Sequence, residues 1–401
     1  MRRAALQLRG RRGARVLGAA RARRSLHVAV VGGGVVGVST ADELLRRGCE
    51  VTLLEATSEV AGAASATHGN AGTLWKSLRG TTPCEPATLW RTLKLLGRDP
   101  GHEKNVFVNS GCLTDAAFYR WALALARAAN PSDYDWRAAH ADAQRYLLER
   151  AAALGAGGLR VAGGEVRSAD GAVVSSDAGD ALGDSALYTQ ALAEDCKARG
   201  LHVWTNAPAE AADGSGVTVD GARVEADVAV LCAGAASTTL LPFYVPIHPL
   251  RGYSVTARVT DVVLAPEASF FVDPEHLYCT RLDGDRVRFT CYGEFVPLRP
   301  TPPTKALETR LKSLIAHAVP DASEWCNFVD CEVWHGDRPL TPDGLPLVGK
   351  LAPGLFINAG HGFNGWRDAG ITAQRVAALI AGGDGDAPAY VEAWAPARFN
   401  F

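Results

Sequence analysis

The sequence predicts an α/β protein in which a domain with a parallel sheet is interrupted by an α+β domain with an antiparallel sheet. Three observations predict this fold. Residues 26–55 have the pattern of a strand, a glycine-rich turn, a helix and a second strand. Strands that end in glycine-rich turns recur in the middle and at the end of the chain, and segments that alternate apolar and polar residues lie between them. A chain of 401 residues also exceeds the usual size of one hydrophobic core, which favours two domains.

The parallel-sheet domain is expected to begin with a β-α-β unit. A buried strand is predicted at Leu26–Val31, followed by a helix to about Arg47, where Gly48 ends it, and by a second strand at Val51–Glu55. The other elements expected in this domain are a helix at Ala186–Arg199, strands at Leu201–Thr205, Val228–Cys232 and Leu355–Asn358, and a helix from about Asp368 to Ala381.

The second domain is expected to contain helices within residues 121–155, turns over 156–185, and strands near 251–259 and 286–295. The chain is therefore divided as follows: a parallel-sheet domain over 26–97, 180–247 and 332–401, and a second domain over 98–179 and 248–331.

Charge is distributed unevenly along the chain. Residues 1–24 hold nine arginines and no acidic residue, although the net charge of the whole chain is only −2. An arginine-rich, acid-free segment is typical of an organelle transit peptide, so residues 1–25 are predicted to be one, mitochondrial in the first instance and plastid in the second. The alternative is a disordered basic arm. The near-neutral total gives no indication of a nucleic-acid partner, and no apolar run is long enough to predict a transmembrane segment.

The turn after the first strand predicts a dinucleotide site. Gly32, Gly34 and Gly37 match the pattern G-x-G-x-x-G: the first permits the tight turn, the second lets a pyrophosphate approach the backbone, and the third lets the helix pack close to the strand. Glu55 ends the second strand, where a carboxylate binds ribose hydroxyls. The alternative is a glycine-rich turn without a ligand. The residues expected to bind the cofactor from this unit are Gly32, Gly34, Val35, Val36, Gly37 and Glu55.

Two further glycine-rich turns favour FAD over NAD. The strand Val228–Cys232 ends at Ala233-Gly234, and Gly360–Gly365 joins the last strand to the last helix. A third strand-to-helix turn suits a long ligand whose flavin ring reaches another helix N-terminus, and NAD would not need it. Glu55 disfavours NADP, whose extra phosphate requires an arginine. FAD is therefore the predicted cofactor.

Five stretches resemble the FAD-dependent D-amino-acid oxidase superfamily, and most nearly its branch of D-amino-acid dehydrogenases of the small-subunit type. They are Val28–Thr40, Ala64–Gly72, Gly183–Ala193, Pro249–Val255 and Trp334–Trp366. The last is the most specific, because it joins Arg338-Pro339-Leu340-Thr341-Pro342-Asp343-Gly344 to the His361-Gly362 turn. The resemblance covers nearly everything after residue 26 and is weakest between about 97 and 170, where this chain is shorter than members of the family.

The resemblance implies a Rossmann-like FAD-binding domain, a substrate domain and a set of site residues. Near the flavin it implies Asn70, Ala71, Gly72, Gly360, His361, Gly362 and Gly365, and the turn after Val228–Cys232 adds Gly234 to the predicted cofactor residues. It also implies that Arg338 binds the substrate carboxylate, with Tyr278, Arg281 and Tyr253 as further pocket candidates. As alternatives, the two tyrosines are strand residues packed in a sheet, and Arg281 is a solvated turn residue. His361 is expected to be a turn residue beside the flavin rather than a general base.

The implied activity is oxidative deamination of small amino acids, with D-amino acids preferred, to 2-oxo acids. A hydride leaves Cα for the flavin, and a quinone or an electron-transfer protein takes the electrons. An arginine fork suits a carboxylate because two parallel hydrogen bonds fix its orientation. Two rival hypotheses are an oxygen-using amine oxidase of the glycine or sarcosine type, and a non-catalytic flavin-binding assembly protein. Peripheral contact with a membrane is compatible with each.

Overall fold

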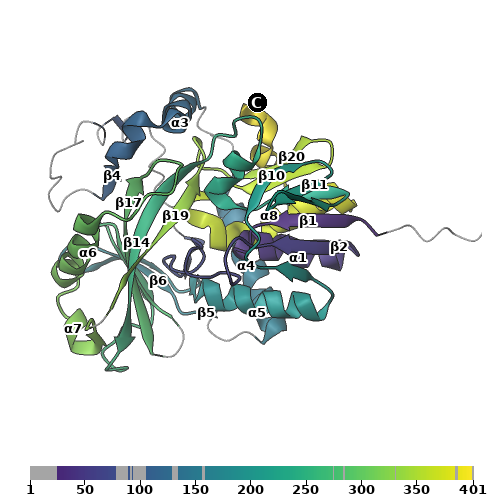
Figure 1. Cartoon of the computed structure of the whole chain (residues 1–401). Coiled ribbons are helices and arrows are strands. Elements are labelled where there is room, and N and C mark those ends of the chain that lie inside the picture. The colour runs from purple at the N-terminus through teal and green to yellow at the C-terminus, as the bar shows by residue number, and fades with distance from the viewer. Residues whose placement is uncertain are drawn as a thin grey trace, which may run out of the picture.

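The structure is a computed structural model, and it describes residues 25–77, 89–90, 93, 105–128, 134–155, 159–273, 275–282, 285–329, 331–383 and 387–399. Figure 1 shows a mainly parallel sheet with its helices on one side of the molecule and a large, mainly antiparallel sheet on the other. This arrangement confirms the predicted fold class. Apart from Ser25, the predicted transit segment lies outside the described residues.

The first sheet has the strand order β20-β21-β13-β1-β2-β9. Five of its strands are parallel: β1 (His27–Val31), β2 (Glu50–Leu54), β9 (His202–Trp204), β13 (Val228–Leu231) and β21 (Leu355–Ala359). The edge strand β20 (Leu347–Ala352) runs antiparallel to β21. β1 lies inside the sheet, and its apolar run Val28–Val31 is buried, as expected of a parallel strand covered on both faces.

Four helices pack together beside this sheet: α1 (Val35–Arg46), α4 (Trp136–Leu154), α5 (Ser185–Ala198) and α8 (Gly365–Ala381). α4 belongs to the segment 98–179 that the sequence assigned to the second domain. Its residues Ala143, Leu147 and Ala151 repeat every four positions and are buried in the same core as β1 and α1. This apolar stripe places α4 with the parallel-sheet domain, which corrects the predicted boundary.

A buried ion-pair cluster joins the same helices. Asp42 of α1 is fully buried and accepts hydrogen bonds from Arg150 of α4 at 2.9 and 3.0 Å. Arg150 also pairs with Asp195 of α5 at 2.6 Å, and Arg199 completes the cluster. Because a buried carboxylate requires such partners, the cluster fixes α4 and α5 against α1.

The second sheet has the strand order β18-β14-β17-β16-β15-β6-β7, with β19 paired to β14 and β4 paired to β17. Its strands are β4 (Val106–Val108), β6 (Gly164–Arg167), β7 (Val173–Asp177), β14 (His248–Val259), β15 (Ser269–Val272), β16 (Leu277–Arg281), β17 (Arg286–Phe295), β18 (Cys326–Asn327) and β19 (Val333–Leu340). On its outer face Val255 and Phe289 pack against α6 (Lys305–Ala318) and α7 (Ala322–Trp325) (Figure 1). The alternate residues of β14 and β17 therefore face the first domain.

Two parts of this sheet differ from the sequence prediction. Residues 156–185, expected as turns, contain β6 and β7. β7 is the mostly exposed edge strand and β6 lies between it and β15, and neither has the apolar alternation that predicts a strand. β19 lies in the segment 332–401 assigned to the first domain, yet it pairs along β14, with Arg338 opposite Leu250 and Trp334 opposite Ser254. The second domain therefore takes a strand from the C-terminal part of the chain.

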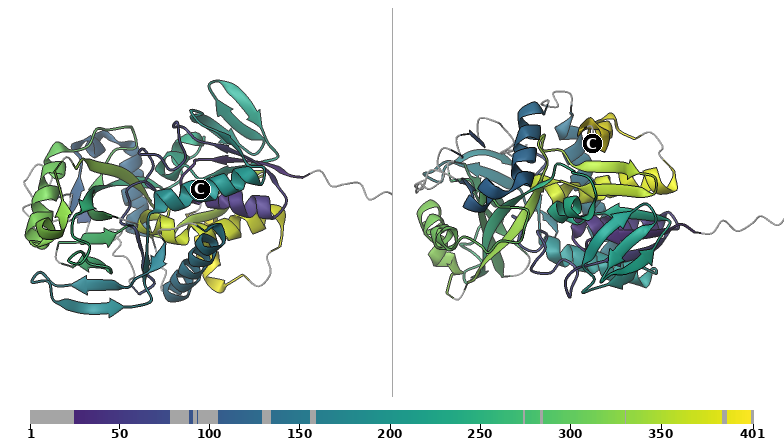
Figure 2. Two further views of the ribbon diagram at one scale, coloured as in Figure 1. Left: turned by 90° about the horizontal axis from the view of Figure 1, so that it is seen from below. Right: turned by 45° about the horizontal axis from the view of Figure 1, so that its top comes forward.

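Smaller elements complete the described fold. A three-stranded sheet of β10 (Ala209–Asp213), β11 (Gly216–Val219) and β12 (Ala222–Glu225) projects from the first domain (Figure 2). The remaining elements are β3 (Thr73–Leu74), β5 (Arg160–Val161), β8 (Ala181–Leu182), α3 (Ala116–Arg127) and the 3-10 helices η1 (Ser110–Thr114), η2 (Gly234–Leu240), η3 (Gly362–Asn364), η4 (Ala389–Trp394) and η5 (Pro396–Phe399). In the described part of the chain, no helix combines the length and the apolar composition needed to cross a bilayer.

Candidate active site

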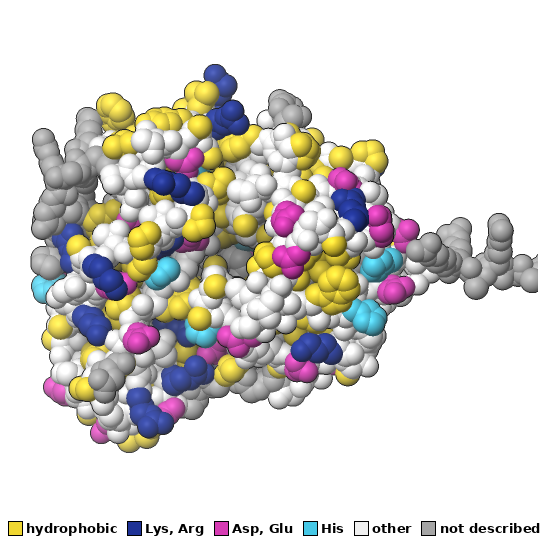
Figure 3. Space-filling model, viewed as in Figure 1, with side chains coloured by type: hydrophobic (Ala, Val, Ile, Leu, Met, Phe, Trp, Pro, Cys, Tyr) yellow, Lys and Arg dark blue, Asp and Glu magenta, His cyan; other side chains and the backbone are white. Residues whose placement is uncertain are grey.

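A cavity of about 2430 Å³ lies between the two sheets. The carboxyl ends of β1, β2, β13 and β21 open into it, which is where ligands bind in open parallel sheets. Figure 3 shows this face of the molecule hollowed near its centre. Pockets for drug-sized ligands measure roughly 300–1,000 Å³, so this cavity has room for an elongated ligand and a second small molecule.

The turn after β1 depends on two glycines. Gly32 has φ +109°, and a Cβ on it would lie 2.7 Å from the carbonyl oxygen of Cys232. A Cβ on Gly37 would lie only 1.8 Å from the carbonyl oxygen of Gly32. The first glycine therefore permits the turn, and the second permits the close contact of α1 with that turn.

The N-terminus of α1 faces the cavity. Gly34 is its N-cap residue and lines the cavity together with Val35 and Val36, so the positive end of the helix borders the ligand space, with the Val35 N–H bonded to the Thr67 hydroxyl. Glu55, just after β2, accepts hydrogen bonds from the Gly33 N–H at 2.7 Å and from the Thr57 N–H at 2.8 Å. Its Oε1 also accepts from the Thr57 hydroxyl at 2.7 Å. A carboxylate has about four acceptor positions, so about one remains, on Oε2, for a hydroxyl of a ligand.

The segment Ala64–Gly72 crosses the cavity and is fixed to both α1 and α5. Thr67 accepts a hydrogen bond from the Val35 N–H at 3.0 Å through its hydroxyl, and its carbonyl accepts one from Ser185. Asn70 donates to the Ser185 hydroxyl at 2.7 Å, and its side-chain oxygen accepts from the Gly72 N–H at 2.8 Å. The backbone of this segment, including Ala71, is therefore held in place at the cavity wall.

The turn after β21 uses left-handed glycines. Gly360 has φ +81° and Gly362 has φ +54°. Between them, His361 is buried, and one of its ring nitrogens lies 3.0 Å from the Thr372 hydroxyl. Burial lowers the pKa of His361 to about 3, so its ring is neutral near pH 7. As a turn residue with an occupied ring nitrogen it is poorly suited to act as a general base.

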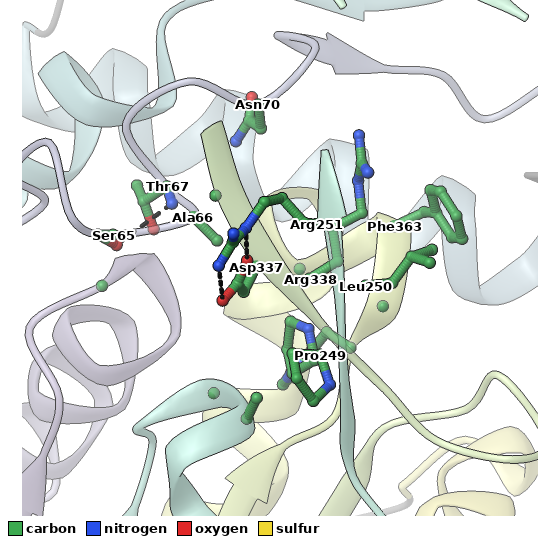
Figure 4. A pocket seen from close by; sticks show the side chains of 18 of the residues that line it. Ser65, Ala66, Thr67, Asn70, Pro249, Leu250, Arg251, Asp337, Arg338 and Phe363 are labelled. Atoms are coloured by element: carbon green, nitrogen blue, oxygen red, sulfur yellow. Dashed lines mark hydrogen bonds and ion pairs between the residues drawn. The ribbon is translucent and has the colours of Figure 1, made fainter. Parts of the chain in front are cut away.

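Arg338 reaches the cavity from β19. Its guanidinium donates to the Tyr292 carbonyl at 3.1 Å and lies 5.1 Å from the centre of the Phe363 ring (Figure 4). A Cβ on Gly252 would lie 2.2 Å from this guanidinium, so the glycine makes room for it. Among the residues that the structure describes, no carboxylate pairs with Arg338.

The neighbouring carboxylates are already paired with other arginines. Asp337 pairs with Arg251 at 2.8 Å, as the dashed lines of Figure 4 show, and Asp343 pairs with Arg398 at 2.6 Å. An ion pair between Arg338 and either aspartate therefore does not hold this loop. Burial lowers the pKa of Arg338, because its charge is partly desolvated without a counter-ion.

The other three pocket candidates have different positions. Tyr278 lines the cavity, packs against Phe271 with ring centres 4.6 Å apart, and has its pKa raised to about 12 by burial. Tyr253 is fully buried outside the cavity, where its hydroxyl donates to Glu294 at 2.5 Å and accepts from the Thr304 N–H. Arg281 also lies outside the cavity wall and donates to the Val262 carbonyl at 3.4 Å. Tyr253 and Arg281 therefore have structural contacts, and neither lines the cavity.

The predicted cofactor residues are brought together, with two qualifications. The following line the cavity: Gly32, Gly34, Val35, Val36, Glu55, Asn70, Ala71, Gly72, Gly234, His361, Gly362 and Gly365. Gly37 and Gly360 do not line it, and both act through packing, since a Cβ on Gly360 would lie 2.7 Å from Thr341.

Several lining residues were not among the predicted site residues. They are the Arg251–Asp337 pair and four residues of the antiparallel sheet: Ser254, Thr256, Arg288 and Thr290. Their signal is polar residues two positions apart within otherwise apolar strands, which places each pair on one face. The sequence does not show that these two faces are neighbours.

The features of the cavity fit FAD. Gly32 and Gly34 leave the helix N-terminus open to a pyrophosphate, Glu55 is placed for ribose hydroxyls, and the turn after β21 offers a second helix N-terminus. The long cavity joins these three places. Fold and cavity together define a protein that binds a flavin dinucleotide.

Comparison with known proteins agrees with this class. The sequence matches the FAD dependent oxidoreductase family (DAO) over residues 27–379, and the chain belongs to that family. FAD is therefore its cofactor, as predicted from the sequence.

Individual curated relatives match about half of the chain. The chain is 31% identical to a D-amino acid dehydrogenase of Vibrio vulnificus over 219 residues, which are 52% of this chain and 51% of that protein. It is 32% identical to a D-amino acid dehydrogenase of Rhizobium johnstonii over 214 residues, 51% of this chain and 50% of that protein. The chain thus matches about half the length of these curated relatives.

Solved structures share the fold. Glycine oxidase from Geobacillus kaustophilus superposes with a TM-score of 0.68 at 18% identity, covering 92% of this chain and 98% of that one. L-proline dehydrogenase from P. horikoshii superposes with a TM-score of 0.66 at 16% identity, covering 94% and 98%. At such identities the similarity shows the fold alone.

Proposed function

We propose that this protein oxidises small amino acids, with D-amino acids preferred, to 2-oxo acids and ammonia. The observation that carries the proposal is Arg338, a guanidinium without a carboxylate partner among the described residues, at the wall of a cavity that fits FAD. The similarity to proteins named D-amino acid dehydrogenase supports the choice of substrate class.

Substrate orientation is the first task of the chain. The Arg338 guanidinium donates two parallel hydrogen bonds to the substrate carboxylate, while its contacts with Tyr292 and Phe363 restrict its direction. Tyr278 keeps its phenol proton at neutral pH, because burial raises its pKa to about 12. Its hydroxyl has no hydrogen-bond partner among the described residues and is available to the substrate.

Neither His361 nor Tyr278 is suited to take a proton from the substrate. His361 is held by Thr372 and stays neutral, and Tyr278 stays protonated. In this proposal the substrate amine loses its proton before the reaction, which raises the electron density at Cα. Bound FAD supplies the two-electron acceptor for the Cα hydrogen. The amino acid becomes an imino acid, and water converts this to the 2-oxo acid and ammonia.

The test is a screen of D- and L-amino acids against the FAD-loaded protein without oxygen. Loss of the oxidised flavin absorbance with D-alanine or another small D-amino acid is the expected result. A flavin that no amino acid reduces would instead support a non-catalytic flavin-binding protein. Reduction only by glycine or sarcosine, followed by rapid reoxidation in air, would favour an amine oxidase.

The electron acceptor is proposed to be a quinone or an electron-transfer protein. Mixing the reduced protein with a soluble quinone or with oxygen in a stopped-flow instrument measures the two reoxidation rates directly. A quinone rate well above the oxygen rate is expected. Faster reoxidation by oxygen than by the quinone would instead assign the protein to the oxygen-using oxidases.

The arginine-rich segment is proposed to be a mitochondrial transit peptide, with a plastid as the second choice. A chain that starts at Ser25 is expected to fold, bind FAD and turn over substrate as the full chain does, because the first strand begins at His27. Flavin content and melting temperature provide the comparison. If the shortened chain loses its flavin while the full chain keeps it, the segment is structural and the targeting proposal is wrong.

A further inference from the structure

A second arginine without a counter-ion lines the cavity. Arg288 of β17 is 3% exposed, and no ion pair joins it to any described residue. Asp184 is the nearby acidic group, but its carboxylate pairs with Arg286 at 2.9 Å and caps α5. Burial lowers the pKa of Arg288 only to about 10, so the group carries its charge at neutral pH.

Arg288 uses only part of its hydrogen-bonding capacity. Its Nε donates to the Thr256 hydroxyl at 3.0 Å, and Nη1 donates to the Asn70 carbonyl at 3.1 Å. A guanidinium carries five N–H donors, and Nη2 has no partner within the described structure. A buried charge left in this condition is costly unless a ligand completes its contacts.

Two hydroxyls on the same face of the sheet also lack partners. Ser254 of β14 is 1% exposed and Thr290 of β17 is 2% exposed, and both line the cavity. Neither side-chain oxygen has a hydrogen-bond partner within the described structure. They lie opposite each other in the β14–β17 ladder, two register steps from the Thr256–Arg288 pair and therefore on the same face of the sheet. The cation and the two hydroxyls therefore form one polar patch, which we call the floor subsite.

The floor subsite and Arg338 are at different places on the cavity wall. Arg338 contacts the carbonyl of Tyr292, which is four residues beyond Arg288 on β17. Four residues of a strand span roughly 13 Å of backbone. The two guanidiniums also share no hydrogen-bond partner, since Arg288 bonds Thr256 and the Asn70 carbonyl. A short molecule with an anionic group at each end therefore suits the pair better than a single anion does.

We propose that the floor subsite binds a second carboxylate on the substrate, so that amino acids with an acidic side chain are the preferred class. This inference rests on the proposed function, since it takes Arg338 as the partner of the α-carboxylate. Arg288 then receives the side-chain carboxylate, with Ser254 and Thr290 as hydroxyl donors to the same group. Aspartate and glutamate are the amino acids with this chemistry.

The alternative acceptor for Arg288 is a carbonyl group of the bound flavin. A binding experiment distinguishes this carbonyl from a second carboxylate on the substrate. Glutarate and glutaramate have the same shape, but only glutarate carries two carboxylates. Each is titrated into the FAD-loaded protein while the change in flavin absorbance is followed. The wild type is expected to bind glutarate at least about tenfold more tightly than glutaramate, because only glutarate offers a second carboxylate to Arg288. Tenfold corresponds to about 1.4 kcal/mol.

The Arg288→Met variant is expected to weaken glutarate binding by about 30-fold or more and to change glutaramate binding little. Arg281→Met is the matched control, because it removes an arginine of the same sheet that lies outside the cavity, and the preference should persist. Equal affinity of the wild type for the two ligands would overturn the proposal. So would an Arg288→Met variant that keeps the preference.

A double variant covers the case in which Arg288→Met fails to fold or to hold FAD. Ser254→Ala with Thr290→Val removes two hydroxyls that have no protein partner, so the fold and the flavin content should be unchanged. Loss of the glutarate preference in this variant supports the floor subsite, and an unchanged preference overturns it. Reduction of the wild-type flavin by D-alanine is measured alongside, because it tests the proposed function and does not involve the floor subsite.

Discussion

Replacing Arg338 with lysine is expected to lower kcat/KM for amino acids by about 30-fold or more, which corresponds to about 2–5 kcal/mol of lost binding. A lysine keeps the charge but is a point charge, and it cannot form the two parallel hydrogen bonds of a guanidinium. The lysine also loses the flat contact with Phe363, which directs the fork into the cavity. Steady-state kinetics with the best substrate of the amino-acid screen measures the loss.

The bound flavin provides the control for this variant. FAD content should be normal, because the cofactor contacts come from the glycine turns and from Glu55. The melting temperature should also change little, since the nearby loop is fixed by the Arg251–Asp337 and Arg398–Asp343 pairs. Kinetics close to wild type would remove Arg338 from the substrate site. A large loss of stability with normal kinetics would make it a structural residue.

The first domain was predictable because its signals are local. The chain passes from a buried strand through a turn with spaced glycines into a helix within a few residues. The glycines of this turn are required because a Cβ at these positions would collide with nearby atoms. The position of Glu55 follows from the same unit, since parallel strands end at one edge of the sheet. Hence most of the predicted cofactor residues line one cavity.

The second domain was harder to predict because its contacts are distant in sequence. β19 pairs with a strand that begins 85 positions earlier, from His248 to Val333, and no local pattern reveals this partner. Tyr253 was a reasonable pocket candidate by resemblance, but strand alternation turns its side chain to the opposite face from Ser254. Arg288 is correctly placed for a ligand only because β17 lies between β14 and β16. Register between strands, rather than composition, decides which residues meet in this site.

Replacing Gly37 with alanine is expected to have a larger effect than replacing Arg338 with lysine. The expected result is loss of bound FAD together with a lowered melting temperature. The added Cβ would lie 1.8 Å from the carbonyl oxygen of Gly32, a backbone atom that cannot rotate away. Either α1 or the turn must move, and both border the pyrophosphate site. Overpacking of this kind costs typically about 1–3 kcal/mol, and more where the backbone resists. Helix propensity acts in the opposite direction, because alanine favours a helix by about 1 kcal/mol over glycine. Any destabilisation must therefore come from the steric contact.

The same substitution at Gly48, just beyond the other end of α1, separates this contact from backbone strain. Gly48 has φ +79°, and a Cβ there would meet no atom within 4 Å. Gly48→Ala should cost about 1–2 kcal/mol, because an L-residue is forced into the left-handed region, and FAD should stay bound. Flavin content after gel filtration and thermal unfolding of both variants provide the measurement. If Gly37→Ala keeps its FAD and its melting temperature, the close approach of α1 to the turn is not required for the cofactor. If Gly48→Ala loses FAD as well, the binding site depends on the stability of the whole β1–α1–β2 unit rather than on one steric contact.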